Sequence, residues 1–542
     1  MFSITVVCII DTFTRIMKKY LAILFLCFST AVFAQENYWQ QSVSYDIDVI
    51  LNDQEKSLKG FETIVYKNNS PSTLDFIWFH IWPNAYKQES TALFQQIKND
   101  TSRVKKLKNY SFGSIEGLNF KVNGTVAATE PHSNPQYIDI IKVKLNSPLK
   151  PGDSVRITTD FKVKLPSYFS RSGFADGEFM VCQWYPKPAV FDKSGWHEFP
   201  YLDMGEFYSD YASFKVDITV PNNYVVGATG VLQNADELAT YKSLGAKNVA
   251  NRDGKPAVYV PKAKTGTKKL TYKISNVPDF AWFADKDFVI QYDTVKLESG
   301  KVIDAFTYYH NKKGSLWVNS IDYTKDAVKK YSGWIGDYEY PVVQVVEGPE
   351  NNSSGGMEYP TITLITSPDA KKESLDAVIA HEVGHNWFMS MLGSNERMHT
   401  WLDEGLNTYF QFRYEAGKYR ANSIFGDHIP AEIKALPEKD FLNSLYNAMG
   451  NIPMKSAIEI PADKFASSDE YGIISYVKTA LWLYILESQA GREKIDKAFK
   501  LYFSKWKNKH PQPEDLKASF EESMGVDLTK YFELLKQEGQ FK

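Results

Sequence analysis

Apolar and polar residues alternate along the first half of the chain, which is the pattern of β-strands with one buried face. The alternation is clearest in Ser42–Leu51 and Ser213–Val220, and turn signals such as Asn68-Asn69-Ser70-Pro71 separate the segments. The predicted strands are Ser42–Leu51, Gly60–Tyr66, Leu74–Trp82, Tyr137–Leu145, Ser154–Val163, Ser213–Val220 and Lys269–Ile274. No long segment with a period of 3.6 residues is found here, so residues 37–290 are predicted to form an N-terminal β domain.

The pattern changes to helical periodicity in the second half. The predicted helices are Ser315–Gly333, Ser374–Met391, Leu402–Ala416, Ile473–Gln489 and Glu514–Ser523. Val342–Val346 reads as a strand, and the loop Gly348–Gly356 after it leads to Met357 and Glu358. We therefore predict an α+β multidomain protein, in which residues 291–542 form a second, catalytic domain.

The N-terminus has the pattern of a targeting segment. Lys18 and Lys19 precede the apolar run Leu21–Phe28, and small residues then lead to a V-x-A site that ends at Ala34. Residues 1–34 are predicted to be a signal peptide, with residues 1–16 upstream of a true start at Met17. A retained anchor is the alternative, although the run is short for a membrane span. We expect an exported protein, periplasmic or secreted, whose mature chain has no stable membrane span.

The composition argues against a nucleic-acid partner and against disulfide bonds in the mature chain. The 542 residues carry a formal net charge of −3, which gives no basic face for nucleic acid. Hydrophobic residues make up 43% and aromatic residues 15%, which suits a large β-rich core. Of the three cysteines, Cys8 and Cys27 lie in the targeting region, so only Cys182 remains and no disulfide within the mature chain is expected.

The helix predicted at Ser374–Met391 carries His381-Glu382-Val383-Gly384-His385, an H-E-x-x-H motif. Positions i and i+4 share one face of a helix, so both imidazoles can reach one metal ion, and Glu382 lies beside them. Glu404 follows eighteen residues after His385, on the next predicted helix. Two His and one Glu form a catalytic zinc set with one open position.

The alternative is that His381 and His385 are core histidines. Ligand spacing with a carboxylate on the following helix argues against this reading. Gly384 does so too, because glycine weakens a helix interior by about 1 kcal/mol and a purely structural helix would have little use for it.

These motifs together resemble the aminopeptidase N family of gluzincin metallopeptidases. The resemblance includes His381, Glu382, His385 and Glu404 in order, Trp387 after the second His, and Trp401-Leu402-x-Glu404-Gly405. It also includes Gly355-Gly356-Met357-Glu358-Tyr359 before the zinc motif. It implies one Zn²⁺ per chain, and a saddle-like β domain followed by a thermolysin-like, mainly helical catalytic domain.

The resemblance also implies roles for other residues. The family's G-x-M-E-N motif, matched by Gly355, Gly356, Met357 and Glu358, binds substrate, and its glutamate binds the free α-amino group. A glutamine of the N-terminal domain approaches the same amine, and Gln183 is the candidate. The family's catalytic tyrosine is matched best by Tyr476, with Tyr471 as the rival.

Some positions depart from the family pattern. Tyr359 replaces the Asn of the G-x-M-E-N motif, Asn386 stands where Gln is more usual, and Asp403 stands where Asn is commoner. The chain ends at Lys542, so the resemblance implies that the helical C-terminal domain of many members is absent. We then expect a more open active site, unless a second subunit covers it.

The function expected from these residues is aminopeptidase activity on peptides with a free N-terminus. Glu382 is the expected general base, Tyr476 the group that stabilises the oxyanion, and Glu358 and Gln183 the amine clamp. Three alternatives remain at this point: a zinc endopeptidase, an epoxide hydrolase of the related leukotriene-hydrolase branch, and a non-catalytic peptide-binding protein. The sequence leaves monomer and homodimer both open.

Overall fold

The structure, a computed structural model, describes residues 38–107, 110–252, 257–260, 265–312, 315–351 and 354–541. The predicted signal peptide, residues 1–34, lies outside the described residues. Contacts join Gln41–Lys542 into one unit, and the arrangement below is that of this unit. The domain boundary predicted at 290/291 falls inside β20 (Val289–Lys296), and the assignment of two domains stays a prediction.

The β-rich region is built on a nine-stranded sheet in the described part of the chain. Its strand order is β17-β18-β15-β1-β2-β9-β5-β6, and β4 also pairs with β9. Buried and exposed residues alternate along β1 and β2, as the sequence pattern predicts. The strands are β1 (Ser42–Asn52), β2 (Ser57–Lys67), β4 (Ser114–Glu116), β5 (Lys121–Val122), β6 (Thr125–Val126), β9 (Ser154–Lys164), β15 (Ala212–Pro221), β17 (Val231–Leu232) and β18 (Thr267–Val277).

This region also contains two four-stranded sheets, with the orders β12-β3-β8-β7 and β10-β11-β19-β16, and a two-stranded sheet of β13 (Val190–Asp192) and β14 (Gly195–His197). Trp184 and Trp282 pack edge to face in the core, with ring centroids 6.3 Å apart. The strands are β3 (Leu74–His80), β7 (Thr129–Pro131), β8 (Ile140–Leu149), β10 (Gly173–Ala175), β11 (Glu178–Val181), β12 (Lys187–Pro188), β16 (Val225–Ala228) and β19 (Trp282–Asp285). The strand predicted to reach Trp82 ends at His80, because Trp82 and Pro83 begin a 3₁₀ turn, where proline is favoured.

The expectation of no long helix in the first half is wrong. α4 (Ala235–Asn251) is a long helix, and the shorter α2 (Ala92–Asn99) and α3 (Thr101–Lys106) also lie in this half. α4 buries few side chains, so it has no strong apolar stripe for a sequence pattern to detect. It packs instead through Gly245, where a Cβ would lie 2.5 Å from Tyr292 Cβ on β20.

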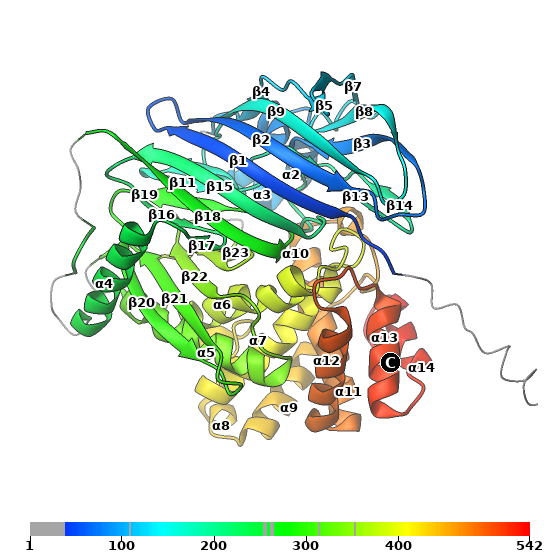
Figure 1. Ribbon diagram of the computed structural model, residues 1–542. Helices are drawn as coiled ribbons and strands as arrows, with labels where there is room; N and C mark the ends of the chain where they lie inside the picture. Colours follow the sequence, from blue (N-terminus) through cyan, green and yellow to red (C-terminus); the bar gives the residue numbers. More distant parts are fainter. Residues whose placement is uncertain are drawn as a thin grey trace, which may run out of the picture. The chain divides into compact units, whose positions relative to one another are not determined.

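The second region combines a five-stranded sheet with many helices, and these helices, green to red in Figure 1, lie on the side of the unit away from β1 and β2. Its sheet has the order β20-β21-β22-β24-β23, with β21 (Val302–Tyr309), β22 (Val342–Glu347), β23 (Gly356–Tyr359) and β24 (Ile362–Ile365). The helices are α5 (Ser320–Trp334), α6 (Lys372–His385), α7 (Glu404–Tyr419), α8 (Ala431–Lys434), α9 (Glu438–Met449), α10 (Ser468–Tyr471), α11 (Thr479–Ala490), α12 (Arg492–Trp506), α13 (Pro513–Met524) and α14 (Thr529–Phe532). A β-rich region followed by a mainly helical region confirms the predicted fold class.

Two of the predicted helices change their winding where they approach the same cavity. α6 ends at His385 and continues as π-helix over Asn386–Met391, and a second π-helical stretch, Gly472–Lys478, leads into α11. Such wider turns are rare in proteins and are frequently found at functional sites.

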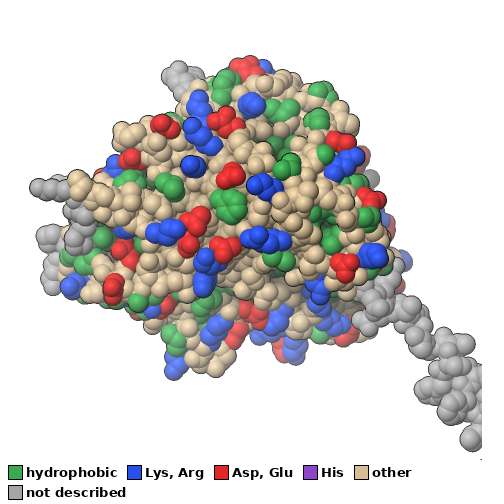
Figure 2. All heavy atoms as spheres, turned by 45° about the horizontal axis from the view of Figure 1, so that its top comes forward, with side chains coloured by type: hydrophobic (Ala, Val, Ile, Leu, Met, Phe, Trp, Pro, Cys, Tyr) green, Lys and Arg blue, Asp and Glu red, His purple; other side chains and the backbone are tan. Residues whose placement is uncertain are grey.

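On the outer face of the large sheet, Figure 2 shows positive and negative side chains interspersed among uncharged ones. Lys215 of β15 pairs with Asp46 of β1, and Lys269 of β18 pairs with Asp48, all at exposed positions. This is the surface of a solvated sheet face. Among the described residues, no helix has both the length and the apolar character that a bilayer crossing needs.

Candidate active site

α6 brings the H-E-x-x-H residues to one wall of a cavity of about 420 Å³. The rings of His381 and His385 are one helical turn apart, with centroids separated by 4.7 Å. Glu373 in the first turn complements the positive end of the helix dipole. A cavity of this volume lies within the usual range for a small-molecule or peptide site.

Glu404 closes a three-residue set with these histidines. As the first residue of α7, it lies where the helix dipole favours a negative charge. Its Oε2 lies 3.3 Å from His381 Nε2 and 3.4 Å from His385 Nε2. The ligand atoms of the three side chains all lie within 4.8 Å of one another, so they converge on one point.

The other nitrogen of each imidazole is held by an acceptor. His381 Nδ1 lies 2.8 Å from Gln411 Oε1, and His385 Nδ1 lies 2.7 Å from Asp403 Oδ1. Each Nδ1 is thus placed to donate to its acceptor, and each Nε2 faces the shared point, where a deprotonated Nε2 can bind a metal ion. This donor set of two imidazole nitrogens and one carboxylate fits a divalent metal such as zinc.

The charges of this cluster shift the pKa values of its members. Burial opposes ionisation of Glu404, but the neighbouring His385 and His381 outweigh it and hold the pKa of Glu404 well below its usual range. Burial likewise opposes the charging of His385, yet Asp403 and Glu404 raise its pKa well above the ordinary value. The cluster therefore favours an ionised Glu404 beside a protonated His385 over two neutral side chains.

Glu382 points into the same cavity from α6. Its side chain is buried, and its Oε2 has no hydrogen-bond partner among the described residues. A Cβ on Gly356 would lie 2.4 Å from Glu382 Oε1, so the glycine of the G-G-M-E-Y motif leaves room for this carboxylate. Burial raises the pKa of Glu382 to about 7, against the lowering effect of the two histidines.

Both candidate tyrosines line the cavity, but in different ways. Tyr476 donates a hydrogen bond of 2.5 Å to Glu404 Oε1, and its ring stacks on His381 at 5.9 Å. The Tyr471 hydroxyl is buried and has no hydrogen-bond partner among the described residues. Tyr476 thus lies directly beside the three-residue set, whereas Tyr471 lies one ring further away, 5.8 Å from the Tyr476 ring.

Residues of the G-G-M-E-Y motif line the cavity beside α6. β23 is the edge strand of its sheet, and Gly355, Gly356, Met357 and Glu358 all line the cavity. Burial, followed by the charge of nearby Glu206, raises the pKa of Glu358 well above its usual value. A cation bound beside Glu358 would relieve both effects.

Gln183 does not line this cavity. Its Oε1 accepts a hydrogen bond of 3.1 Å from the Tyr359 hydroxyl, and it borders a separate void of about 20 Å³ behind Glu358. That void has room for about one water molecule. The role predicted for Gln183 therefore stays a prediction.

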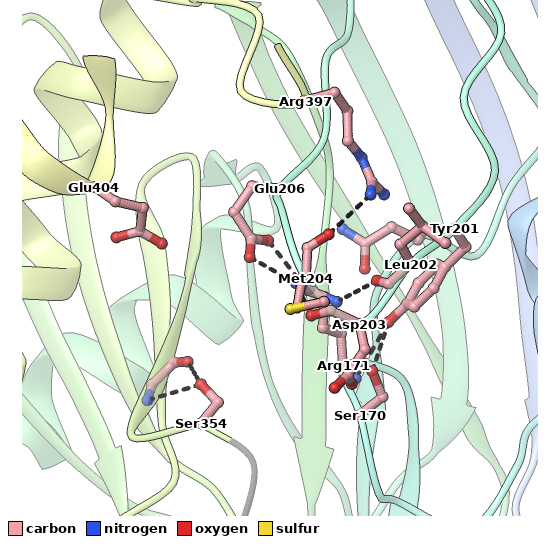
Figure 3. Close-up of polar contacts among 12 residues, drawn as sticks. Ser170, Arg171, Tyr201, Leu202, Asp203, Met204, Glu206, Ser354, Arg397 and Glu404 are labelled. Atoms are coloured by element: carbon pink, nitrogen blue, oxygen red, sulfur yellow. Dashed lines mark hydrogen bonds and ion pairs between the residues drawn. The ribbon is translucent and has the colours of Figure 1, made fainter. Parts of the chain in front are cut away.

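Sequence reasoning missed Glu206, which faces the cavity from the β-rich region. Its carboxylate lies with those of Glu358 and Glu404 in a second converging set, with oxygens within 4.8 Å of one another. Figure 3 shows Glu206 and Glu404 bordering the same space, with Arg171 on the other side of Glu206. Glu206 lies in an irregular segment, so no periodicity or motif in the sequence marks it.

Comparison with known sequences adds to this geometry. Residues 320–534 match the peptidase family M1 domain. Leucine aminopeptidase 2 of Chaetomium globosum is 27% identical over 232 residues, which cover 42% of this chain and 36% of the relative. The Aspergillus fumigatus protein of the same name is 31% identical over 208 residues (35% and 30%), and a leukotriene A-4 hydrolase homolog of Botryotinia fuckeliana is 29% identical over 213 residues (38% and 31%). The matches span about a third of the length of these relatives.

The likeness to solved structures extends over more of the chain. A two-domain M1 zinc metallopeptidase variant bound to L-arginine superposes with a TM-score of 0.60 at 15% identity, covering 93% of this chain and 95% of that one. A Deinococcus radiodurans M1 zinc metallopeptidase variant bound to a Tyr-Ser-Ala substrate gives 0.60 at 15% identity, with 92% and 94% covered. At this identity the likeness carries the fold, and the matched domain contains His381, His385 and Glu404. Residues 320–534 of this chain therefore form a peptidase family M1 domain, and the fold of the chain is that of two-domain M1 zinc metallopeptidases.

Proposed function

We propose that this protein is a zinc-dependent aminopeptidase that removes the N-terminal residue of peptides. His381, His385 and Glu404 would hold the zinc ion. Names of relatives such as leucine aminopeptidase 2 support this reading, although the matches span only part of those proteins. The proposal therefore depends chiefly on the arrangement of side chains in the cavity.

One observation carries the proposal: Glu404 belongs to two converging sets of side chains. With His381 and His385 it forms a set suited to a divalent metal, and with Glu206 and Glu358 it forms an all-carboxylate set. A cation bound in the second set lies next to a metal bound in the first. The peptide bond nearest a substrate's N-terminal ammonium is then the bond that reaches the metal.

The spacing of the second set suits an ammonium group. An ammonium nitrogen donates at about 2.8 Å in tetrahedral directions, so three acceptors around it stand about 4.6 Å apart. The oxygens of Glu206, Glu358 and Glu404 lie within 4.8 Å of one another. An N-acetylated peptide offers a neutral amide there, which would leave buried carboxylates without a counter-charge.

The reaction would then use Glu382 and Tyr476, which line the same cavity. Zinc, when bound, supplies a Lewis acid that acidifies water and polarises the scissile carbonyl. Glu382 accepts the proton of the attacking water and later delivers it to the leaving amine. Tyr476 donates a hydrogen bond to the negative charge that develops on the carbonyl oxygen of the scissile peptide bond.

The test is hydrolysis of a panel of aminoacyl chromogenic substrates, each free and N-acetylated, with and without a chelator. We expect cleavage of the free set alone, loss of activity on chelation, and recovery on addition of Zn²⁺. Cleavage of both sets would favour the zinc endopeptidase and remove the amine role from Glu358. Binding of peptides without cleavage of either set would favour the non-catalytic binding protein.

We also propose that the protein is exported, with cleavage after Ala34, on the strength of the N-terminal sequence pattern. Fractionation of the cells that produce the protein, with N-terminal sequencing of the mature form, tests this proposal. A cytoplasmic protein with an uncleaved N-terminus would contradict it. Light scattering of the purified protein decides between monomer and homodimer.

A further inference from the structure

An irregular segment, residues 200–206, carries Glu206 to the cavity and is called the strap below. The strap lies between β14 (Gly195–His197) and β15 and has no helix or strand of its own. Its backbone polar groups are therefore not satisfied by regular secondary structure and need other partners. Those partners decide how firmly Glu206 is held.

Two buried arginines supply most of these partners. Arg171 donates to the carbonyl oxygens of Leu202 at 3.0 Å and Asp203 at 3.4 Å. Arg397 donates to the carbonyl oxygens of Met204 at 3.0 Å and Pro200 at 3.1 Å. Figure 3 shows both guanidinium groups directed at the strap.

The two arginines come from different parts of the fold. Arg171 lies in the β-rich region just before β10, whereas Arg397 lies between α6 and α7, shortly before Glu404. From a third direction, Gln96 Oε1 of α2 accepts hydrogen bonds from the backbone N–H groups of Asp203 at 2.7 Å and Met204 at 2.9 Å. The strap is thus held by residues from both the β-rich and the helical region.

Arg171 also binds the Glu206 carboxylate itself. Its Nε and one terminal nitrogen donate to the two oxygens at 3.1 Å and 2.6 Å, and only 7% and 9% of the two side chains are exposed. A two-point fork of this kind fixes the carboxylate plane as well as its position. Without it, Glu206 would face Glu358 and Glu404 as a third carboxylate with no cation, and repulsion would turn it away.

We propose that Arg171 is a positioning residue for substrate binding, which holds the Glu206 carboxylate where the substrate's α-ammonium meets Glu358 and Glu404. This inference rests on the proposed aminopeptidase function. Arg171 touches neither the scissile bond nor the metal set. Its removal therefore weakens substrate binding and leaves the chemical step largely intact.

The first experiment is a double-mutant cycle with Arg171→Met and Glu206→Gln on an unblocked substrate. We expect Arg171→Met to raise KM about tenfold or more, with kcat within about threefold of wild type. The double variant should have the KM of Glu206→Gln alone, because Arg171 acts only through Glu206. Additive effects of the two substitutions, or a fall in kcat without a rise in KM, would overturn the proposal.

Arg413→Met is the matched control. Arg413 is as buried as Arg171 and makes a similar fork to Asp496, at 2.7 Å and 3.1 Å, but it does not line the cavity. It should lower thermal stability and leave KM unchanged. If it raises KM as much as Arg171→Met does, the effect of Arg171 is general destabilisation and the proposal is wrong.

The second experiment measures binding without turnover. Calorimetry compares L-leucinamide with N-acetyl-L-leucinamide on chelator-treated protein, and wild type should bind the free amine about tenfold or more tightly. Arg171→Lys keeps the positive charge but cannot form the two-point fork, so it should lose most of the preference for the free amine. This variant tests the proposal even if Arg171→Met does not fold. An unchanged preference in Arg171→Lys would overturn the positioning role, whereas no preference in wild type would overturn the proposed function itself.

Discussion

Glu382 has the surroundings of a proton acceptor. One of its oxygens lies against Gly356 and the other has no partner among the described residues, while burial raises its pKa to about 7. A carboxylate that is neither paired nor solvated keeps its basicity for a substrate or a water molecule. The Nε2 atoms of His381 and His385 face Glu404. Different side chains therefore serve metal binding and proton transfer.

Glu382→Gln should therefore lose activity and keep its metal. We expect kcat to fall by about 10²–10⁴-fold, the usual contribution of a general base. Metal content after dialysis should match that of wild type, because Glu382 does not belong to the set of His381, His385 and Glu404. Wild-type activity in this variant would rule out Glu382 as the base.

Tyr476 and Tyr471 offer a comparison within one wall of the cavity. Tyr476→Phe should lower kcat by about 10²-fold or more, because its hydroxyl lies beside Glu404 where the oxyanion would develop. Tyr471→Phe should change kcat by less than about tenfold. Steady-state kinetics on one unblocked substrate measure both, and the reverse order would assign the catalytic role to Tyr471.

Local spacing explains which site residues the sequence could predict. His381, Glu382 and His385 lie within two turns of one helix, and Glu404 begins the next helix, so a short window contains their geometry. Glu206 comes from an irregular segment in the other region, and its partner Arg171 is 35 positions away in the chain. No sequence window shows that these residues meet, and the choice of Gln183 had only the family resemblance to guide it.

At the scale of elements, glycines set how closely the helices of the site approach. A Cβ on Gly384 would lie 2.1 Å from Asn407 Oδ1 of α7 and 2.5 Å from the Tyr331 ring of α5. The sequence argument that a structural helix has little use for Gly384 is therefore wrong. Helix packing requires this glycine, and the packing brings α6 close enough to α7 for His381 and Glu404 to meet.

Gly384→Ala should consequently destabilise the protein, although alanine favours a helix by about 1 kcal/mol. The steric overlap costs about 1–3 kcal/mol or more and should win. Gly333→Ala in α5 is the control, since its Cβ would meet nothing within 4 Å and should stabilise slightly. Thermal unfolding of both variants measures the contrast, and a Gly384→Ala protein as stable as wild type would contradict the packing argument.

Elements that lack a strong pattern were also missed. α4 has no wide apolar stripe, whereas β1 and β2 alternate so regularly that the sequence predicts them within a few residues. A periodic pattern of apolar residues shows which face of a helix or strand packs against the core. This periodicity carries little information on a helix such as α4, which buries only a few side chains.

At the scale of the whole molecule, buried carboxyl groups couple stability to pH. Asp139 is buried in the β-rich region, where its Oδ2 accepts a hydrogen bond of 2.7 Å from the Tyr201 backbone N–H. Burial raises the pKa of Asp139 to about 7, above the value of an unfolded chain. The folded state therefore holds this proton more tightly, and the stability it contributes is lost as pH rises towards 7.

Asp139→Asn should remove this dependence, because an amide keeps the acceptor without a charge. Between about pH 4 and pH 7, wild type should lose about 1 kcal/mol of stability per pH unit relative to the variant. Urea unfolding at several pH values measures the difference. Asp160→Asn on the exposed face of β9 is the control, and equal pH dependence in Asp139→Asn and wild type would contradict the prediction.

The parallel pairing of β1 with β15 has a consequence for how the chain acquires its fold. Lys215 and Asp46, partners across this pair, are 169 residues apart in the chain. β1 and β2 can form a hairpin early, but the other edge of β1 stays open until β15 is available. A fragment that stops before β15 exposes an unpaired strand edge, which is a template for aggregation. The β-rich region is thus not completed in the order in which it is synthesised, and its closure is expected to limit the rate of refolding.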